Sequence, residues 1–500
     1  MKLRLSRHGG VANPRDTYGY RCGLRLALTR NASVSFCAAI RRAEHWPDPA
    51  SKPHRGTAVP DHLFYQSAVK LPTIARAQGV YAWDVDGRRY VDACSGAIVA
   101  QIGHGHPAVR AAMLDQLDKV AFAYRTQFEN QPALDLAQRL VDLGGGRFDR
   151  VFFSSGGSES VESALKIARQ YWVCRGEPQR KVFIARKPSY HGATMGALSM
   201  TSYTPLTQPF GPMFPLYPKV ASPTQYRVPA GRSVAEHALA CADELEAAIL
   251  EAGAAHVAAF IAEPIGGAST GAEVPHAGYF SRIREICSRH GVLLILDEVM
   301  TGMGRTGRWF GYEHWDVRAD IVCLAKGLGA GYYPVSAIMT RAEVTDPVLA
   351  AGGFQHGYTY AGNPLASATA LAVIDVIERE GLVENAASTG AYLLQSLEQL
   401  ASRHGFIGDV RGRGFLLAVE YVADRASKEP FAPALCFGEA ITRAARDCGL
   451  IVYPRKSLMG ETGDHTLIAP PLITTPAQCD EIVDLLDAAC TAVQRTADAR

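Results

Sequence analysis

The stretch from Val292 to Lys326 reads VLLILDEVMTGMGRTGRWFGYEHWDVRADIVCLAK, and it contains two apolar runs that each end at a charged residue. Asp297 follows the run Val292 to Leu296, and Lys326 follows the run Ile321 to Ala325. Unbroken runs of branched apolar residues are typical of strands covered on both faces. Ligands bind open α/β sheets at the carboxyl ends of the strands, so we expect both charged residues in one largely dry site.

Together, the acid and the lysine point to one cofactor. A buried carboxylate needs a cationic partner, and the protonated ring nitrogen of pyridoxal 5'-phosphate (PLP) is one. Desolvation lowers the pKa of a lysine and frees its amine as a nucleophile toward an aldehyde. Taken singly, Asp297 is more often a turn or cap residue and Lys326 a solvated one, so the interpretation depends on further motifs.

The composition is that of an ordinary globular protein. The 500 residues are 48% hydrophobic and 20% charged, which is enough for two domains with a large core. The formal net charge of +2 predicts no nucleic-acid partner, and no apolar stretch approaches the roughly 18 residues that span a membrane. The 11 cysteines form no CxxC pair and no Cys/His cluster, so we expect core residues of a reducing compartment and no metal site.

Residues 1–60 differ from the remainder because they contain nine arginines and only three acidic residues. An arginine-rich, acid-poor start resembles an organelle transit peptide. The alternatives are a disordered leader or upstream sequence included by a wrong start codon. We favour these alternatives and a cytoplasmic location, because no apolar periodicity organises the segment.

From Asp61 onward, strands alternate with helices, which predicts a mostly parallel sheet covered by helices. The segment Val80 to Asp92 predicts a hairpin with its tight turn at Asp86-Gly87. Further strands are predicted at 151–153, 181–185, 257–262, 292–296, 321–324 and 335–340, and helices at 108–120, 133–143, 161–172, 234–251, 279–290 and 365–378.

The pattern changes after Gly381, where short strands at 414–421 and 450–453 lie among helices at 385–404, 437–448 and 477–496. This change predicts a smaller α+β domain at the carboxyl end. We therefore expect a segment at 61–110 that contributes to the small domain, a large cofactor-binding domain at 111–384, and the small domain at 385–500.

Three further motifs are compatible with PLP. Gly157 and Ser158 lie in a Gly/Ser turn between a strand and a helix, where free N–H groups and the helix dipole favour a phosphate. Tyr190 follows a strand, and its ring can lie flat on a planar cofactor; the alternative is that Tyr190 and His191 are core residues. Thr359 lies in a turn-rich loop before a helix, where its hydroxyl can donate to a phosphate oxygen.

Taken as a set, these motifs resemble those of the class III (ω, or subgroup II) aminotransferases of PLP fold type I. The resemblance extends from about Asp61 to the carboxyl end, and the aspartate motif with its correctly spaced lysine is highly specific. The motifs are GGSES at 156–160, YHG at 190–192, AEP at 262–264, LLILDEV with TG and GRTG at 293–307, AKGLGAGYYP at 325–334, HG-T-AGNPLA at 356–366 and DVRGRG at 409–414.

The resemblance implies a homodimer with shared active sites and assigns the cofactor-binding roles. Lys326 would be the Schiff-base lysine, Asp297 the partner of the ring nitrogen, and Val299 and Tyr190 the residues on the two ring faces. The phosphate would be held by Gly157, Ser158 and, from the neighbouring subunit, Thr359.

The resemblance also suggests where the substrate binds. Arg411 stands where many family members keep an arginine near the substrate carboxylate. Tyr124 and Arg125 are expected in the pocket wall, although a solvated arginine is the usual alternative.

Several departures from the family concern the substrate. Ala268 ends the run IGGA. At this place the ornithine and γ-aminobutyrate aminotransferases have IQGE, whose glutamate neutralises the arginine that binds the substrate. Met300 stands where several relatives have a glutamine beside the phenolic oxygen of the cofactor, and Ile98 is aligned with a tryptophan of many amine transaminases.

The expected function is PLP-dependent transfer of the amino group of a small-molecule amine or amino acid to a 2-oxo acid, either pyruvate or 2-oxoglutarate. Within the same fold, an aminomutase or a decarboxylating transaminase is the alternative, and the need for an external 2-oxo acid distinguishes them. A non-catalytic PLP-binding protein is a third possibility, but it would not require both Lys326 and Asp297.

Overall fold

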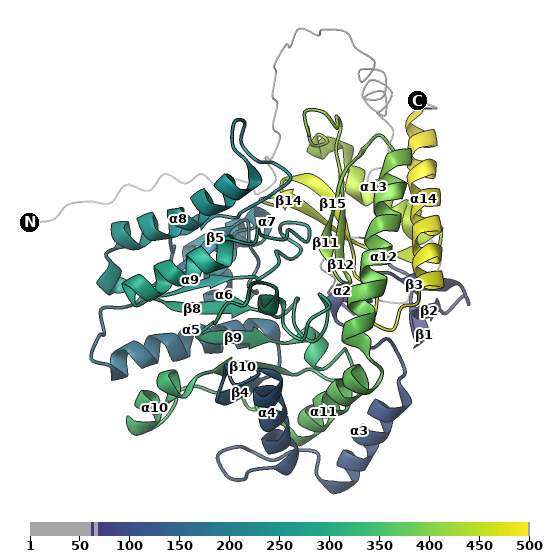
Figure 1. The fold of residues 1–500 in the computed structure, drawn as a ribbon. Coiled ribbons are helices and arrows are strands. Elements are labelled where there is room, and N and C mark those ends of the chain that lie inside the picture. The colour runs from purple at the N-terminus through teal and green to yellow at the C-terminus, as the bar shows by residue number, and fades with distance from the viewer. Residues whose placement is uncertain (1–61, 65–68, 499–500) are drawn as a thin grey trace, which may run out of the picture.

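The computed structural model describes residues 62–64 and 69–498, so the leader predicted at residues 1–60 lies outside the described part. Its centre is a seven-stranded sheet in the order β4-β10-β9-β8-β7-β5-β6 (Figure 1). Only β10 runs antiparallel to its neighbours, which confirms the predicted α/β fold with a mostly parallel sheet. The strands are β4 (Arg150–Ser154), β5 (Val182–Lys187), β6 (Lys219–Ala221), β7 (Val257–Ala262), β8 (Leu293–Asp297), β9 (Ile321–Leu324) and β10 (Ser336–Thr340).

Helices cover both faces of this sheet, which explains why its strands are apolar without alternation. In β8, Leu293 and Ile295 pack in the same buried cluster as α5, whereas Leu294 and Leu296 pack in the cluster that contains α8 and α9. The covering helices are α4 (Gln131–Leu143), α5 (Gly157–Cys174), α6 (Met195–Met200), α8 (Val234–Ala252), α9 (Tyr279–His290), α10 (Ala342–Ala350) and α11 (Pro364–Arg379).

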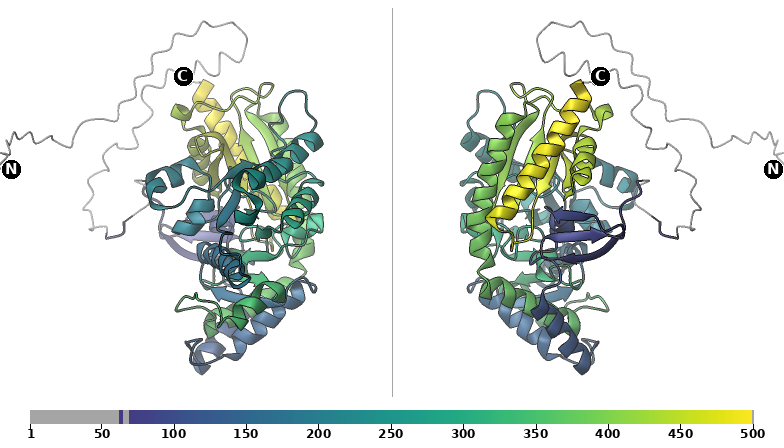
Figure 2. Two further views of the ribbon diagram at one scale, coloured as in Figure 1. Left: turned by 90° about the vertical axis from the view of Figure 1, so that its left-hand side faces the viewer. Right: turned by 90° about the vertical axis from the view of Figure 1, so that its right-hand side faces the viewer.

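The carboxyl-terminal part is built on a four-stranded antiparallel sheet in the order β11-β12-β15-β14. Three helices pack together against it, and two of them lie side by side along its outer side (Figure 2). The strands are β11 (Ile407–Arg413), β12 (Leu416–Tyr421), β14 (Tyr453–Leu458) and β15 (Thr462–Ile468), and the helices are α12 (Leu382–Arg403), α13 (Phe437–Asp447) and α14 (Pro476–Asp498).

The predicted hairpin is present as β2 (Tyr81–Asp84) and β3 (Arg89–Asp92), preceded by a strand that was not predicted, β1 (Ile74–Gln78). Strand β3 pairs in parallel with β13 (Leu450–Ile451), so the start of the described chain contacts its carboxyl-terminal part. This is the contact expected if residues 61–110 contribute to the small domain. Of the described helices, none is both long enough and apolar enough to cross a bilayer.

Among the elements that differ from the sequence prediction, two show the physical reason plainly. Helix α5 begins at Gly157, four residues before the predicted start, because its first turn is made of small and polar residues without apolar periodicity. Strand β11 was not predicted, since Asp409, Arg411 and the glycines beside them break the alternation expected of a strand.

Candidate active site

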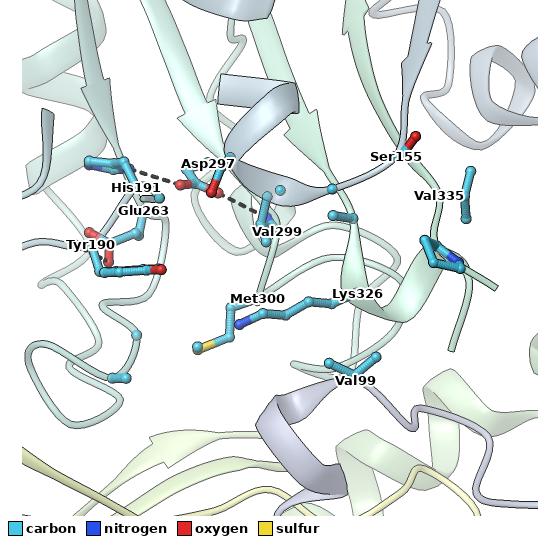
Figure 3. A pocket seen from close by; sticks show the side chains of 18 of the residues that line it. Val99, Ser155, Tyr190, His191, Glu263, Asp297, Val299, Met300, Lys326 and Val335 are labelled. Carbon is cyan, nitrogen blue, oxygen red and sulfur yellow. Dashed lines mark hydrogen bonds and ion pairs between the residues drawn. The ribbon is translucent and has the colours of Figure 1, made fainter. Parts of the chain in front are cut away.

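The carboxyl ends of β8 and β9 bring Asp297 and Lys326 to one cavity of about 380 Å³ (Figure 3). Asp297 is the last residue of β8, and Lys326 begins the turn that follows β9. The remaining lining comes from the start of α5, from the loops after β5 and β7, and from two loops on the opposite side. These residues are Val99, Ser155, Gly156, Gly157, Ser158, Tyr190, His191, Gly192, Glu263, Gly267, Ala268, Val299, Met300, Ala325, Gly331, Tyr333, Pro334 and Val335.

Asp297 is buried and oriented by two hydrogen bonds. Its Oδ2 lies 2.8 Å from Nδ1 of His191, and its Oδ1 accepts the Val299 N–H at 3.0 Å. Because an ionised carboxylate only accepts, Nδ1 of His191 carries the proton in this pair. His191 is itself buried, and its Nε2 has no hydrogen-bond partner. The residue that the sequence left open as a core histidine therefore orients the carboxylate.

Lys326 has an amine that is easily deprotonated. Desolvation lowers its pKa to about 8, against the opposing effect of Asp297. Its side chain extends across the cavity toward Met300 (Figure 3). The backbone of Lys326 has φ of 44°, in the left-handed region that non-glycine residues rarely adopt and that is concentrated at functional sites.

The first turn of α5 contributes Gly157 and Ser158 to the cavity. Its N-cap residue, Gly156, has no side chain to bond the first N–H groups of the helix. A Cβ at Gly157 would lie 2.9 Å from Cγ1 of Val299, so only glycine fits without a shift. The Ser158 hydroxyl accepts the Ala193 N–H at 3.0 Å. Free N–H groups at a helix start favour a phosphate, so this geometry is compatible with the phosphate role of Gly157 and Ser158, which stays a prediction.

Glu263 lines the cavity, and in the sequence it is recognisable only as part of the AEP motif. Its Oε1 accepts the Tyr190 N–H at 3.3 Å, and its Oε2 lies 3.3 Å from Nη2 of the buried Arg186. Through this pair, Glu263 holds the backbone that carries the Tyr190 ring. No sequence signal links Arg186 to Glu263, because 77 positions separate them.

Ile98, which was aligned with the tryptophan of amine transaminases, does not line the cavity. Ile98 is buried in an apolar cluster with Ile265 and Leu416, and Val99 lines the cavity instead. Positive φ angles at Ser95, Gly96 and Ile98 kink the chain here, and this kink decides which side chain faces the cavity.

Four expected site residues lie outside the cavity of a single chain. Arg411, on β11, is paired with the carboxylates of Asp409 and Glu420 and does not line the cavity, so its expected place near the substrate carboxylate stays a prediction. Arg125 is exposed and donates to the His356 carbonyl at 3.1 Å. Tyr124 is half-buried, and Thr359 is exposed. Arg125, Tyr124 and Thr359 lie on one surface region. The Phe122 ring contacts the rings of both Tyr124 and Tyr360, and Tyr360 follows Thr359 in the sequence.

Comparison with known proteins agrees with this geometry. Residues 65–490 match the family described as aminotransferase class III. The chain belongs to the class III aminotransferases. A putrescine–pyruvate aminotransferase of Pseudomonas aeruginosa is 35% identical over 82% of the chain and 89% of its own length. A taurine–pyruvate aminotransferase of Bilophila wadsworthia is 35% identical over 87% of the chain and 95% of its own length.

Among solved structures, the chain is similar to an amine transaminase from an uncultivated Pseudomonas species in a PLP-bound (internal aldimine) form. It shares 39% identity and a TM-score of 0.81, and the match covers 88% of this chain and 98% of that one. This class III aminotransferase therefore uses PLP. The cavity fits the cofactor, since it combines a lysine, a buried carboxylate and a helix start whose glycine packs on Val299.

Proposed function

We propose that this class III aminotransferase transfers the amino group of a primary amine or amino acid to pyruvate or 2-oxoglutarate. The proposal rests on one observation: Lys326, whose pKa is lowered, and Asp297, whose carboxylate is oriented by His191, line the same cavity. The names of two relatives, which specify pyruvate, support pyruvate as the first acceptor to test.

The residues would divide the chemistry as follows. PLP, when bound, supplies a ring that withdraws electrons and stabilises negative charge on the substrate carbon. Asp297 would keep a proton on the ring nitrogen through a charged hydrogen bond, worth roughly 1.5–3 kcal/mol. Lys326 would attach the cofactor and, once displaced by the substrate amine, move a proton to or from the substrate carbon, which contributes about 10² to 10⁴ in rate.

The other cavity residues would hold the cofactor in place. The N–H groups at Gly157 and Ser158 would bind its phosphate, and Tyr190 and Val299 would contact its two ring faces. Met300 has no hydrogen-bond donor for the phenolic oxygen of the cofactor, so the protein's contact with that oxygen would come from another residue.

A substrate carboxylate would be bound by Arg455. No arginine is among the described residues that line the cavity, and a 2-oxo acid requires a cation. Arg455 lies on β14, where its Nη2 donates to the Tyr453 hydroxyl at 2.5 Å. Desolvation lowers the pKa of Lys326 and raises the pKa of Tyr190, and the positive charge of Arg455 adds to the first shift and opposes the second, so Arg455 acts electrostatically on two cavity residues. Within the described residues, Arg455 makes no ion pair that would compete with a substrate.

A second copy of the chain would complete the site. The exposed region around Thr359 carries Phe122, Phe128 and Tyr360, which are 44%, 67% and 60% exposed. Contiguous exposed aromatic residues mark interfaces between proteins. Burial of this region in a homodimer would bring Thr359 of one subunit to the phosphate site of the other, as the family resemblance implies.

The decisive experiment is an absorption spectrum of the PLP-loaded protein before and after addition of single amino donors. The set is alanine, β-alanine, taurine, a diamine and a benzylic amine, followed by pyruvate or 2-oxoglutarate. A yellow protein that one donor bleaches and a 2-oxo acid restores supports the proposal and identifies both substrates. A protein that stays colourless after reconstitution, or that turns over without an external 2-oxo acid, contradicts it.

A further inference from the structure

Arg411 is held in a cluster of charges behind the cavity. Its Nη1 donates to Asp409 at 2.7 Å, its Nη2 donates to Glu420 at 2.6 Å, and its Nε lies 3.5 Å from Glu273. Only 11% of its side chain is exposed, and Glu420 is buried completely. A guanidinium surrounded by three carboxylates is not available to a substrate carboxylate, so another role is needed for this arginine.

The cluster reaches across to the loop at 266–273, which connects β7 to α9. Arg411 Nη2 also donates to the Thr270 carbonyl at 2.8 Å. The loop is buried throughout and closes on itself, because Gly266 N–H donates to the Glu273 carbonyl at 2.8 Å and Gly271 N–H to the Gly267 carbonyl at 3.0 Å. Arg411 therefore contacts both a backbone carbonyl and the acidic end of one compact loop.

The approach of Arg411 to this loop requires glycine at position 271. Gly271 has φ of 68°, in the left-handed region, and a Cβ there would lie 2.6 Å from Arg411 Nη2. The loop and the guanidinium are thus fitted closely together, with no room for a side chain between them.

The opposite side of the same loop is the cavity wall. Gly267 and Ala268 line the cavity, and a Cβ at Gly267 would lie 2.9 Å from Sδ of Met300. Ala268 also packs in a buried cluster with Leu416 of β12 and Leu467 of β15. A shift of the loop toward or away from Arg411 would change the width of the cavity on its substrate side.

We propose that Arg411 is a positioning residue, which fixes the Gly267–Ala268 wall of the substrate cavity by tying loop 266–273 to strands β11 and β12. This inference rests on the proposed function for its kinetic consequence. On this proposal, a residue that lies outside the cavity and does not contact the substrate helps to determine which amine the cavity accepts.

The test compares Arg411→Gln, Arg411→Lys and Glu273→Gln with the control Arg413→Gln, all loaded with PLP. Arg413 lies on the same strand and is exposed, and its Nη1 contacts His314. Hydrogen exchange at the loop amides is one readout. The other is the pair KM and kcat for four amines: a small and a bulky one without a carboxylate, and a small and a bulky one with it.

Arg411→Gln is expected to speed exchange at the amides of Gly266 and Gly271 by about tenfold or more. It is expected to raise KM for the two small amines by about tenfold and KM for the two bulky amines by less, with kcat within about threefold for all four, so that discrimination against the bulky amines falls. The exchange rates and KM values of Arg411→Lys are expected to lie between those of the parent and of Arg411→Gln, because lysine keeps the positive charge but lacks the several N–H donors of a guanidinium. Arg413→Gln should match the parent.

A folded, PLP-loaded Arg411→Gln protein with unchanged loop exchange and unchanged KM would overturn the proposal. A KM increase confined to amines with a carboxylate would also overturn it, in favour of a direct substrate contact. Failure of the parent to transfer amino groups would refute the proposed function instead, and the exchange readout would still decide whether Arg411 holds the loop.

Discussion

The proposed role of Lys326 predicts that the rate at which the apoprotein captures its cofactor depends on pH. Only the neutral amine attacks an aldehyde, and the pKa of Lys326 is lowered to about 8 from the usual 10.5. We expect the rate of PLP incorporation to rise with pH and to level off above about pH 8. Stopped-flow absorbance across this range would measure it. An incorporation rate that keeps rising to pH 10 would indicate a solvated lysine. The Lys326→Ala variant should lose the absorption band of bound PLP, and its rate of amino transfer should fall by about 10² to 10⁴.

His191 acts through Asp297. Replacement by phenylalanine leaves a buried carboxylate oxygen without its donor, which costs about 1–3 kcal/mol. We expect His191→Phe to lower kcat by roughly tenfold to a hundredfold and to shift the absorption maximum of bound PLP. His290→Phe, a change at a surface ion pair, is the control. A normal kcat with a normal spectrum would show that Asp297 needs no orienting partner.

Arg455 separates substrates by charge. Loss of a charged hydrogen bond of about 1.5–3 kcal/mol should raise KM for pyruvate by roughly tenfold to a hundredfold in Arg455→Gln. KM for a diamine should stay the same or fall, because a nearby positive charge is removed. Steady-state kinetics with both substrates give the comparison. Equal changes for the diamine and pyruvate would argue against carboxylate binding at this residue.

At the scale of elements, the proposed phosphate site at the start of α5 depends on the close packing of Gly157 on Val299. Gly157→Ala places a methyl group 2.9 Å from Val299 Cγ1, so we expect weaker PLP binding by about tenfold. The matched control is Gly156→Ala, since a Cβ at Gly156 meets nothing within 4 Å. Addition of Val299→Ala to Gly157→Ala should recover part of the affinity in a fluorescence titration. Equal losses in both alanine variants would place the effect in the backbone instead.

At the scale of the whole molecule, the proposed sharing of active sites predicts complementation between two variants that each carry one defective site residue. A mixture of Lys326→Ala and Thr359→Ala chains would form heterodimers in which one site keeps both native residues. Random exchange of subunits then restores about a quarter of the parent sites. The measurement is activity after mixing, with light scattering to confirm the dimer. Activity no greater than the average of the two separate variants would show that each site lies within one chain.

Elements with a strong local pattern were predictable, and elements without one were not. The apolar runs of β7 to β10 predict buried strands because both of their faces are covered, and the amphipathic helices α8 and α9 were found nearly to the residue. Strand β11 was missed because its buried face carries the charges of Asp409 and Arg411, and only partners distant in sequence make those charges tolerable.

The sequence by itself determined the fold class, the family resemblance and the positions of Asp297, Lys326 and Gly157. Each of these follows from local chemistry: an apolar run that ends at a charge, or a glycine turn that opens a helix. The tertiary structure alone decided that His191 orients Asp297, that Val99 lines the cavity and that Arg411 holds a loop. These facts depend on contacts between residues 100 or more positions apart, or on a backbone kink, and neither is encoded in a local pattern.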